Sequence, residues 1–417
     1  MDYFVKDIKL AEQGRMNMEW AQMQMGALAK VRERFKKEKP LAGIRVGMAL
    51  HVTKETGLLV RTLVDGGAKV SITGCNPLST QDDIAAALAE DGVAVFAYKG
   101  ETHEDYYKFL NKVLDDKPQA TIDDGCDLIS EIHTKRKDLL KDLIVGCEET
   151  TTGIIRVRAM ERDKVLKYPI IAVNDNLTKH LFDNYYGTGQ STLDGILRCT
   201  NLLLAGKQFV VIGYGDCGKG VANRASGMGA NVIVCEAEPV RALQAFADGY
   251  RVMPIMEASK IGDVFVTITG NKRVISWEHM QSMKNGAVLA NSGHFNAEID
   301  VDSLEQNKVS KRRIRWQLDE YQLKNNKKIF LCAEGRLVNL AAAEGHPSEV
   351  MDLSFCGQSL ALEYGIKNKG KLEPKVYTLP REIDQQIAQL KLDSLGLKKD
   401  NLTAEQLKYL NSWEEGT

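Results

Sequence analysis

Residues 213–218 carry the sequence GYGDCG, a spacing of glycines that suits the binding of a dinucleotide. The apolar run 208–212 predicts a buried strand before them, and 219–228 predicts a helix after them. Glycines let the backbone approach a pyrophosphate, and the start of the helix offers N–H groups and positive potential. A second predicted strand, 231–235, ends at Glu236, where an acid suits the ribose hydroxyls of NAD and disfavours a 2′-phosphate. A glycine turn alone would explain the six residues, but the strands and the acid in register favour an NAD site. Its predicted residues are Gly213, Gly215, Gly218 and Glu236.

Polar residues also follow the predicted strands of the first half of the chain. His51, Thr53 and Glu55 come after one strand, Asp124 after another, and the sequence EETTTG at 148–153 after a third. Open α/β sheets bind ligands at the carboxyl ends of their strands, so we predict a second ligand site there. Each group alone is also compatible with a solvated loop or a helix cap.

A helical segment at 174–184 contains a further candidate pair. Lys179 and Asp183 are four residues apart and therefore neighbours on one helix face. Such a pair is either a surface ion pair or part of a site.

The elements that must position these residues follow an α/β rhythm. Strands are predicted at 44–50, 69–73, 93–98, 120–122 and 143–145, with a helix at 55–65, and later strands at 264–267 and 287–290. Strands that alternate with helices imply parallel sheets. We therefore predict an α/β protein with two Rossmann-like, doubly wound parallel-sheet domains. The charged end of the chain predicts a small helical C-terminal appendage with little core of its own.

Composition narrows the function classes. The chain has 417 residues, 44% of them hydrophobic, and a net charge of -1, which argues against nucleic acid or an anionic membrane as a partner. Eight cysteines are scattered without a C-x-x-C pair, as expected of reduced thiols and not of a metal site. The first residues lack an apolar signal region, and no 18-residue apolar run occurs. We expect a soluble cytoplasmic enzyme.

The chain resembles the S-adenosyl-L-homocysteine hydrolase family almost from end to end. The resemblance rests on long motifs in the same order, which are STQD at 79–82, EETTTG at 148–153, ND at 174–175, Lys179, FDN at 182–184, GYGDCGKG at 213–220, GHF at 293–295, AEGRLVNL at 333–340 and GHPS at 345–348. It implies a substrate-binding domain at 1–184 that returns at 346–383, an NAD-binding Rossmann domain at 185–345 and the appendage at 384–417. It also implies reversible hydrolysis of S-adenosyl-L-homocysteine to adenosine and L-homocysteine.

The implied reaction uses tightly bound NAD without net oxidation. A thioether at C5′ is a poor leaving group, and oxidation at C3′ acidifies the C4′ proton, so that homocysteine can be eliminated. Water then adds, and the retained hydride returns to C3′. The implied partners are a nucleoside thioether and, as is usual in the family, three further copies of the chain in a homotetramer.

The resemblance assigns roles to three sets of residues, and no metal is implied. Lys179 takes the 3′-hydroxyl proton, and Asp124 and His51 handle the C4′ proton, the thiolate and water. The implied catalytic residues are Lys179, Asp183, Asn184, Asp124, His51 and His294. The implied substrate-binding residues are Thr53, Glu55, Glu149, Thr150, Lys179, Asp183, His346, Met351 and Phe355. The implied NAD-binding residues are Thr150, Thr151, Thr152, Asn184, Gly213, Gly215, Asp216, Cys217, Gly218, Glu236, Asn271, Asn339 and His346.

The chain departs from the family pattern in three features. Thr188 replaces a cysteine near the nicotinamide, the chain lacks a longer tail with a lysine and a tyrosine, and Glu344 replaces a methionine beside the base pocket. Glu344 either points to solvent or accepts a hydrogen bond from N1–H of hypoxanthine, which makes S-inosyl-L-homocysteine an alternative substrate. More remote alternatives are an NAD-dependent 2-hydroxyacid dehydrogenase and a non-catalytic regulatory binder.

Overall fold

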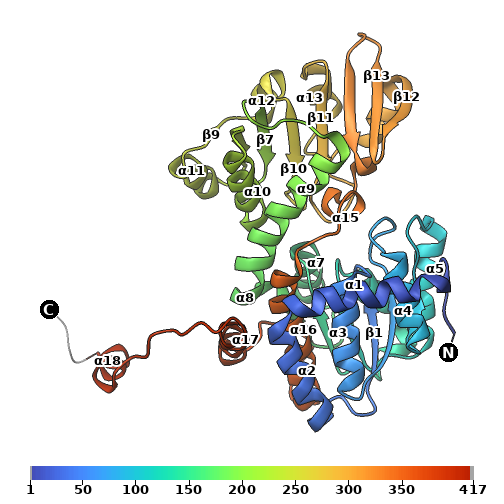
Figure 1. Ribbon diagram of the computed structural model, residues 1–417, viewed down its shortest axis with the longest axis vertical. Helices are drawn as coiled ribbons and strands as arrows, with labels where there is room; N and C mark the ends of the chain where they lie inside the picture. The colour runs from blue at the N-terminus through green and yellow to red at the C-terminus, as the bar shows by residue number, and fades with distance from the viewer. Residues whose placement is uncertain (1, 414–417) are drawn as a thin grey trace.

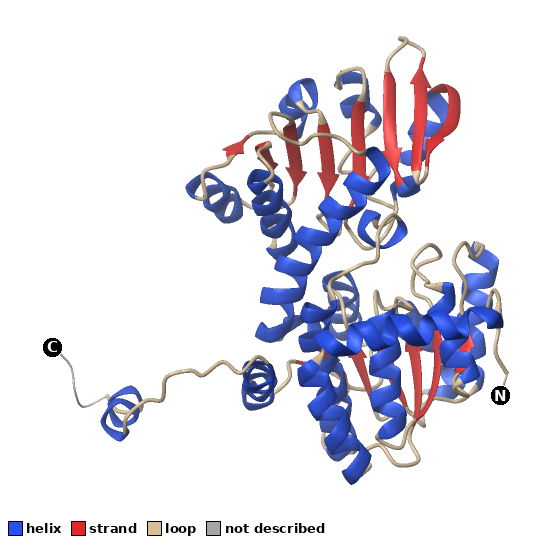
Figure 2. Ribbon diagram, viewed as in Figure 1, coloured by secondary structure: helices blue, strands red, loops and turns tan. Residues whose placement is uncertain are grey.

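The computed structural model describes residues 2–413; Met1 and residues 414–417, the last four of the predicted appendage, lie outside the described part. Figure 1 shows two lobes, each built around one β-sheet, and a C-terminal helix that lies away from both. The alternation of red strands and blue helices in Figure 2 confirms the predicted α/β class with two Rossmann-like sheets.

The first lobe contains a sheet of seven parallel strands within residues 2–413. In spatial order these are β15 (Val376–Tyr377), β6 (Ile170–Ala172), β5 (Val145–Glu148), β4 (Ala120–Asp123), β1 (Arg45–Ala49), β2 (Lys69–Thr73) and β3 (Ala94–Phe96). The chain runs outward from β1 to β3 and then returns to the other side of β1 at β4. The strand order therefore reverses between β1 and β4, which is where a doubly wound sheet binds ligands.

Helices pack on both faces of this sheet and bury its strands, as is usual for a parallel sheet. One core cluster joins it to α1 (Ala11–Gln24), α2 (Gly26–Glu38), α3 (Lys54–Asp65), α4 (Asp82–Glu90) and α16 (Ser348–Lys367). The cluster on the opposite face involves α5 (His103–Asp115), α6 (Asp127–Thr134) and α7 (Thr151–Arg162). Because α16 and β15 belong to this lobe, the chain enters it twice.

The second lobe contains an eight-stranded sheet in the described range. Its order is β12 (Lys308–Arg315), β13 (Leu318–Leu323), β14 (Lys328–Cys332), β11 (Ala287–Asn291), β10 (Val264–Thr267), β7 (Gln208–Ile212), β8 (Asn231–Cys235) and β9 (Arg251–Val252). The strands from β14 to β9 are parallel, and β13 pairs antiparallel with both of its neighbours. Here the strand order reverses between β7 and β10, directly after the glycine motif begins.

Helices again form two layers on this sheet. One core cluster includes residues of α9 (Thr188–Thr200), α10 (Asp216–Gly227), α11 (Pro239–Ala247) and α15 (Val338–Ala341). The other includes α12 (Ile255–Ile261), α13 (Trp277–Ser282) and α14 (Val301–Asn307). The predicted helix after the glycines starts at Asp216 and not at Lys219, so that Asp216 and Cys217 form its first turn.

Short helical segments connect the lobes. Their 3₁₀ and α-helical parts are η3 (Val173–Asp175) and α8 (Leu177–Lys179), and the π-helix η4 (His180–Gly187) follows and leads into α9. The predicted helix at 174–184 is thus a 3₁₀ turn, a short α-helical turn and the first part of a π-helix, in that order. A π-helix of this length is rare and is typical of functional sites.

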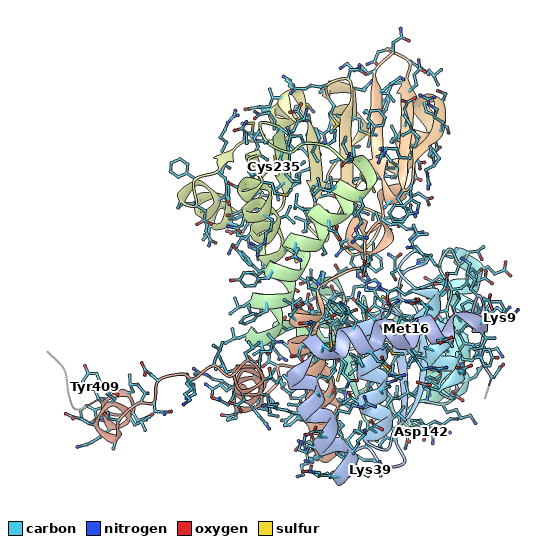
Figure 3. All side chains as sticks on the ribbon, viewed as in Figure 1. Lys9, Met16, Lys39, Asp142, Cys235 and Tyr409 are labelled. Carbon is cyan, nitrogen blue, oxygen red and sulfur yellow. The ribbon has the colours of Figure 1, made fainter. Side chains whose placement is uncertain are left out.

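The remaining elements lie at the ends and edges of the lobes. They are η1 (Ile8–Leu10), η2 (Lys137–Leu139), η5 (Ala333–Gly335), α17 (Arg381–Ser394) and α18 (Ala404–Leu410). No residue of α18 is buried, and Figure 3 shows Tyr409 far from both lobes. Among residues 2–413, no helix is both long and apolar enough to cross a membrane.

The glycine-rich face of α10 allows close packing against η4. A Cβ atom at Gly220 would collide with the backbone carbonyl of Tyr185, whereas one at Gly227 on the same helix would meet nothing within 4 Å. Backbone atoms cannot move aside as the end of a flexible side chain can. The packing of η4, which connects the two lobes, against α10 therefore requires a glycine at position 220.

We expect Gly220→Ala to lower the free energy of unfolding by about 1–3 kcal/mol, because the added methyl group overpacks this contact. Gly227→Ala is the matched control and is expected to change stability by less than about 1 kcal/mol in either direction. Thermal unfolding followed by circular dichroism measures both. Equal midpoints for the two variants would contradict the packing argument.

Candidate functional site

Both sheets direct the carboxyl ends of their central strands toward one cavity of about 330 Å³ between the lobes. His51 follows β1 and Asp124 follows β4, at the point of reversed strand order in the first lobe. Gly213 and Ile268 follow β7 and β10, at the corresponding point of the second lobe. Two ligand-binding edges therefore share one cavity, as a reaction between a cofactor and a substrate requires.

Most of the predicted site residues line this cavity. They are His51, Thr53, Glu55, Asp124, Glu149, Thr150, Thr151, Thr152, Lys179, Asp183, Asn184, Gly213, Gly215, Asp216, Cys217, Glu236, His294, Asn339, His346, Met351 and Phe355. Gly218 lies behind the glycine turn, where a Cβ atom would collide with the carbonyl of Gly213. Asn271 is exposed and does not line the cavity; its N–H donates to Thr269 Oγ1 at 3.0 Å.

A buried ammonium group lies at the centre of the cavity wall. Lys179 is 4% exposed, and its Nζ donates to Asn184 Oδ1 at 2.8 Å. Oxygen atoms of Glu149 and Asp183 each lie 3.5 Å from Nζ. Burial opposes the charge, but Asp183 and Glu149 outweigh it and raise the pKa of Lys179 above its ordinary value. In the free protein this lysine is therefore an ammonium.

The two carboxyl groups around Lys179 differ in their own partners. Asp183 accepts from His346 Nδ1 at 2.8 Å and from Ser354 Oγ at 2.7 Å. Although burial opposes its charge, Lys179 and His346 hold the pKa of Asp183 well below its usual range. Burial raises the pKa of Glu149 to about 7, against the opposing effect of Lys179, and Gln358 Nε2 donates to it at 2.5 Å. Asp183 is thus a fixed anion, and Glu149 can exchange a proton near neutral pH.

A second cluster combines residues of both lobes. Asp124 Oδ2 lies 3.4 Å from His51 Nε2, and Asp124 Oδ1 lies 3.5 Å from Nδ1 of His294, which comes from the second lobe. Nδ1 of His51 lies 2.7 Å from Ser79 Oγ and 3.2 Å from Cys75 Sγ. Burial lowers the pKa of His51 to about 4, despite the opposing charge of Asp124. His51 is therefore neutral at pH 7.

This second cluster could also hold a metal ion by geometry. One ligand atom from each of His51, Asp124 and His294 lies within 4.8 Å of the others. The same three groups can also carry protons without a metal, because carboxyl and imidazole groups in contact can pass a proton between them.

Buried carboxyl groups fix the loops that carry these residues. Glu148 Oε1 accepts from the N–H of Gly125 at 2.9 Å and from that of Thr150 at 3.1 Å, so it ties the loop after β4 to the loop after β5. A Cβ atom at Gly153 would collide with the Glu148 carboxyl group. Burial raises the pKa of Glu148 far above its usual value. The EETTTG motif therefore positions Asp124 and Glu149 together.

Helix α16 lines the cavity with the predicted residues Met351 and Phe355. Ser348, Ser354 and Gln358 on the same helix, which the sequence analysis did not predict, lie behind the lining and hold Glu55, Asp183 and Glu149 by hydrogen bonds. Ser348 Oγ donates to Glu55 Oε1 at 2.6 Å. The spacing of three and four residues between these positions was a signal that could have identified the whole helix face.

Glu344 does not line the cavity. Its side chain is 61% exposed and pairs with Lys54 at 3.0 Å and Arg198 at 3.4 Å. Of the two predicted orientations, the structure has the one that faces solvent. Conversely, Arg241 lines the cavity although it was not predicted, and no motif in the sequence marked it.

The second-lobe half of the cavity fits NAD. A Cβ atom at Gly215 would meet only Arg241 Nη1, at 3.7 Å, so the glycine backbone is open to the cavity. Glu236, directly after β8, lines the cavity and accepts from the N–H of Tyr214 at 2.6 Å. Asn339 Oδ1 is buried without a hydrogen-bond partner and suits the amide N–H of a nicotinamide. A pyrophosphate at the start of α10 would meet its free N–H groups and Arg241.

Comparisons with known proteins agree with this geometry. Residues 184–345 match the family model described as the S-adenosyl-L-homocysteine hydrolase NAD binding domain, and residues 2–146 match that of S-adenosyl-L-homocysteine hydrolase. The chain is 58% identical to the adenosylhomocysteinase of Sulfolobus acidocaldarius over 417 residues, and 59% identical to that of Aquifex aeolicus over 418 residues. It is also 58% identical to the S-inosyl-L-homocysteine hydrolase of Methanocaldococcus jannaschii over 415 residues. Each match covers 100% of both chains. The prediction of NAD as the cofactor is confirmed.

Proposed function

The chain belongs to the S-adenosyl-L-homocysteine hydrolase family, and on that premise we propose that it hydrolyses S-adenosyl-L-homocysteine reversibly to adenosine and L-homocysteine. The observation that carries the proposal is that two proton-transfer clusters, around Lys179 and around Asp124, face the NAD cradle across one cavity. A simple dehydrogenase needs one such cluster for its single proton and hydride transfer. Two clusters suit a reaction with two kinds of proton transfer at different carbon atoms.

NAD supplies hydride removal and return at C3′ when it is bound. The chain's residues move the protons. Lys179 accepts the proton of the 3′-hydroxyl, and Asn184 and Asp183 hold its Nζ in place. Thr150, Glu149 and His346 orient the ribose. The lysine must first lose its own proton, and Glu149, with its pKa of about 7, is the neighbour best able to take it.

The second cluster serves the later steps. Neutral His51 and Asp124 take the C4′ proton, protonate the departing thiolate and activate the water that replaces it. His294 closes the cluster from the second lobe, so these groups meet only when the lobes are together. Placing the reaction between the two lobes limits the access of bulk water to the intermediate.

Adenine is the base that the first lobe suits best. Glu55 is buried and lines the cavity, with one oxygen engaged by Ser348. A carboxylate accepts from the N6 amino group of adenine but repels O6 of hypoxanthine. S-inosyl-L-homocysteine is the second candidate substrate, because the chain is equally similar to the S-inosyl-L-homocysteine hydrolase of Methanocaldococcus jannaschii.

Exposed apolar side chains on and just after α18 support a proposal about assembly. Leu407, Leu410 and Trp413 are 48%, 66% and 92% exposed, and α18 packs on neither lobe. Burying such side chains against another subunit would stabilise the assembly, and we propose the homotetramer that is usual in the family.

The cysteines support a proposal about location. All eight are free in the described chain, as expected in the reducing environment of the cytoplasm.

The first functional prediction concerns cofactor use. Purified protein is expected to carry bound NAD and to turn over without added NAD, because each cycle returns the hydride it removes. Product formation is measured by mass spectrometry, with NAD and NADH quantified after denaturation. Stoichiometric NADH accumulation during steady turnover would instead support a dehydrogenase.

The second prediction separates the two clusters. Lys179→Ala should lower the rate of NAD reduction by bound substrate about 10²- to 10⁴-fold, since it removes the base at C3′. Asp124→Asn should spare that step and block elimination, so that enzyme-bound NADH accumulates. Stopped-flow absorbance at the NADH band distinguishes the two variants. If Asp124→Asn abolishes turnover without any bound NADH, Asp124 does not act in the later steps.

The third prediction concerns pH. Below its pKa of about 7, Glu149 is protonated and cannot take the proton from Lys179, so the rate of NAD reduction should rise with pH through about 7. Glu149→Gln should be slower and should lose this limb of the profile. Single-turnover rates between pH 5.5 and 8.5 test both statements. An unchanged profile in the variant would remove Glu149 from the proton path.

A further inference from the structure

Lys54 lies between two carboxylates next to the base end of the cavity. Its Nζ is 3.0 Å from Glu344 Oε2 and 3.5 Å from Glu55 Oε1, and the Lys54 side chain is only 12% exposed. Glu55 lines the cavity, whereas Lys54 does not. The ammonium therefore reaches Glu55 from outside the cavity.

Glu344 is held in this place from two sides. It lies in the connection from α15 back to α16, and its other oxygen is 3.4 Å from Arg198 Nη2 on α9. The carbonyl of Glu344 also accepts from Gln81 Nε2 at 3.4 Å. Backbone and side chain are thus both anchored, and the carboxylate remains turned toward Lys54.

Lys54 and Glu344 are both charged around neutral pH. Burial opposes the charge of Lys54, but Glu55 and Glu344 outweigh it and raise its pKa. Lys54 in turn lowers the pKa of Glu344, and Arg198 adds to that effect. A charged lysine shared between two carboxylates moves toward whichever partner remains when the other is removed.

We propose that Glu344 determines base specificity indirectly, as a positioning residue that keeps the Lys54 ammonium outside the cavity and leaves Glu55 free to accept a hydrogen bond from adenine. The inference rests on the proposed function, in which Glu55 contacts the base. Glu344 itself does not touch the substrate.

The chemistry of the two bases gives the inference a direction. With Lys54 held by Glu344, the edge of the cavity at Glu55 is an acceptor, which suits N6–H₂ of adenine and repels O6 of hypoxanthine. Without Glu344, the flexible Lys54 side chain is free to engage Glu55 fully and to donate to O6. Loss of Glu344 should therefore shift preference toward hypoxanthine. Direct reading of hypoxanthine N1–H by Glu344 would produce the opposite shift.

The test compares kcat/KM for S-adenosyl- and S-inosyl-L-homocysteine in the full-length protein and in Glu344→Gln. We expect the adenosyl-to-inosyl ratio to fall about 2- to 5-fold, a size typical of a partly exposed ion pair. Glu349→Gln is the matched control, because Glu349 is also exposed, lies five residues further on, and makes the same change of charge. Its ratio should equal that of the wild type.

A double-mutant cycle with Lys54→Met isolates the proposed route. In the Lys54→Met background, Glu344→Gln should no longer alter the ratio, because the residue through which it acts is gone. A ratio that rises or stays constant in Glu344→Gln, or an effect that persists without Lys54, would overturn the inference alone. A wild-type protein that hydrolyses neither thioether would overturn the proposed function, and the inference with it.

Discussion

The burial of the Lys179 ammonium between two carboxyl groups is the interaction on which the rest of the site depends. A buried charge is stable only when it is paired and hydrogen-bonded, and here Asn184, Asp183 and Glu149 meet that need. These partners come from η4 and from the loop after β5, and Asp183 and Glu149 are held in turn by Ser354 and Gln358 of α16. One charged group thus requires three distant segments of the chain to meet.

The two sheets meet this requirement with one arrangement used twice. Each reverses its strand order at the centre, and each places its reactive loops there, so that the first lobe supplies proton carriers and the second supplies the cofactor cradle. Asp124 then receives a histidine from each lobe. The site is complete only because residues of both lobes line it. The close packing of α10 on η4 keeps Lys179 beside the glycine motif.

Much of this could be predicted from the sequence where the signal is local. Strand 208–212, strand 231–235 and Glu236 could be predicted because spacing along the chain determines their geometry. The family resemblance led to Lys179, Asp124 and His294, which the fold brings to one cavity. The π-helix, Arg241 and the ion pairs of Glu344 with Lys54 and Arg198 could not be predicted, because they depend on contacts between segments up to 290 residues apart. Asn271 shows the opposite case, since the family resemblance assigns it to NAD binding but its side chain does not line the cavity.

The central claim is that hydride leaves C3′ and returns to it while the C4′ proton exchanges with solvent. Hydrolysis of unlabelled S-adenosyl-L-homocysteine in D₂O, followed by NMR of the adenosine formed, tests this most directly. The account predicts deuterium at C4′ and none at C3′, because Asp124 and His51 exchange protons with water and the cofactor retains its hydride. Adenosine without deuterium at C4′ would contradict the account, since Asp124 and His51 would then not have exchanged the C4′ proton with water.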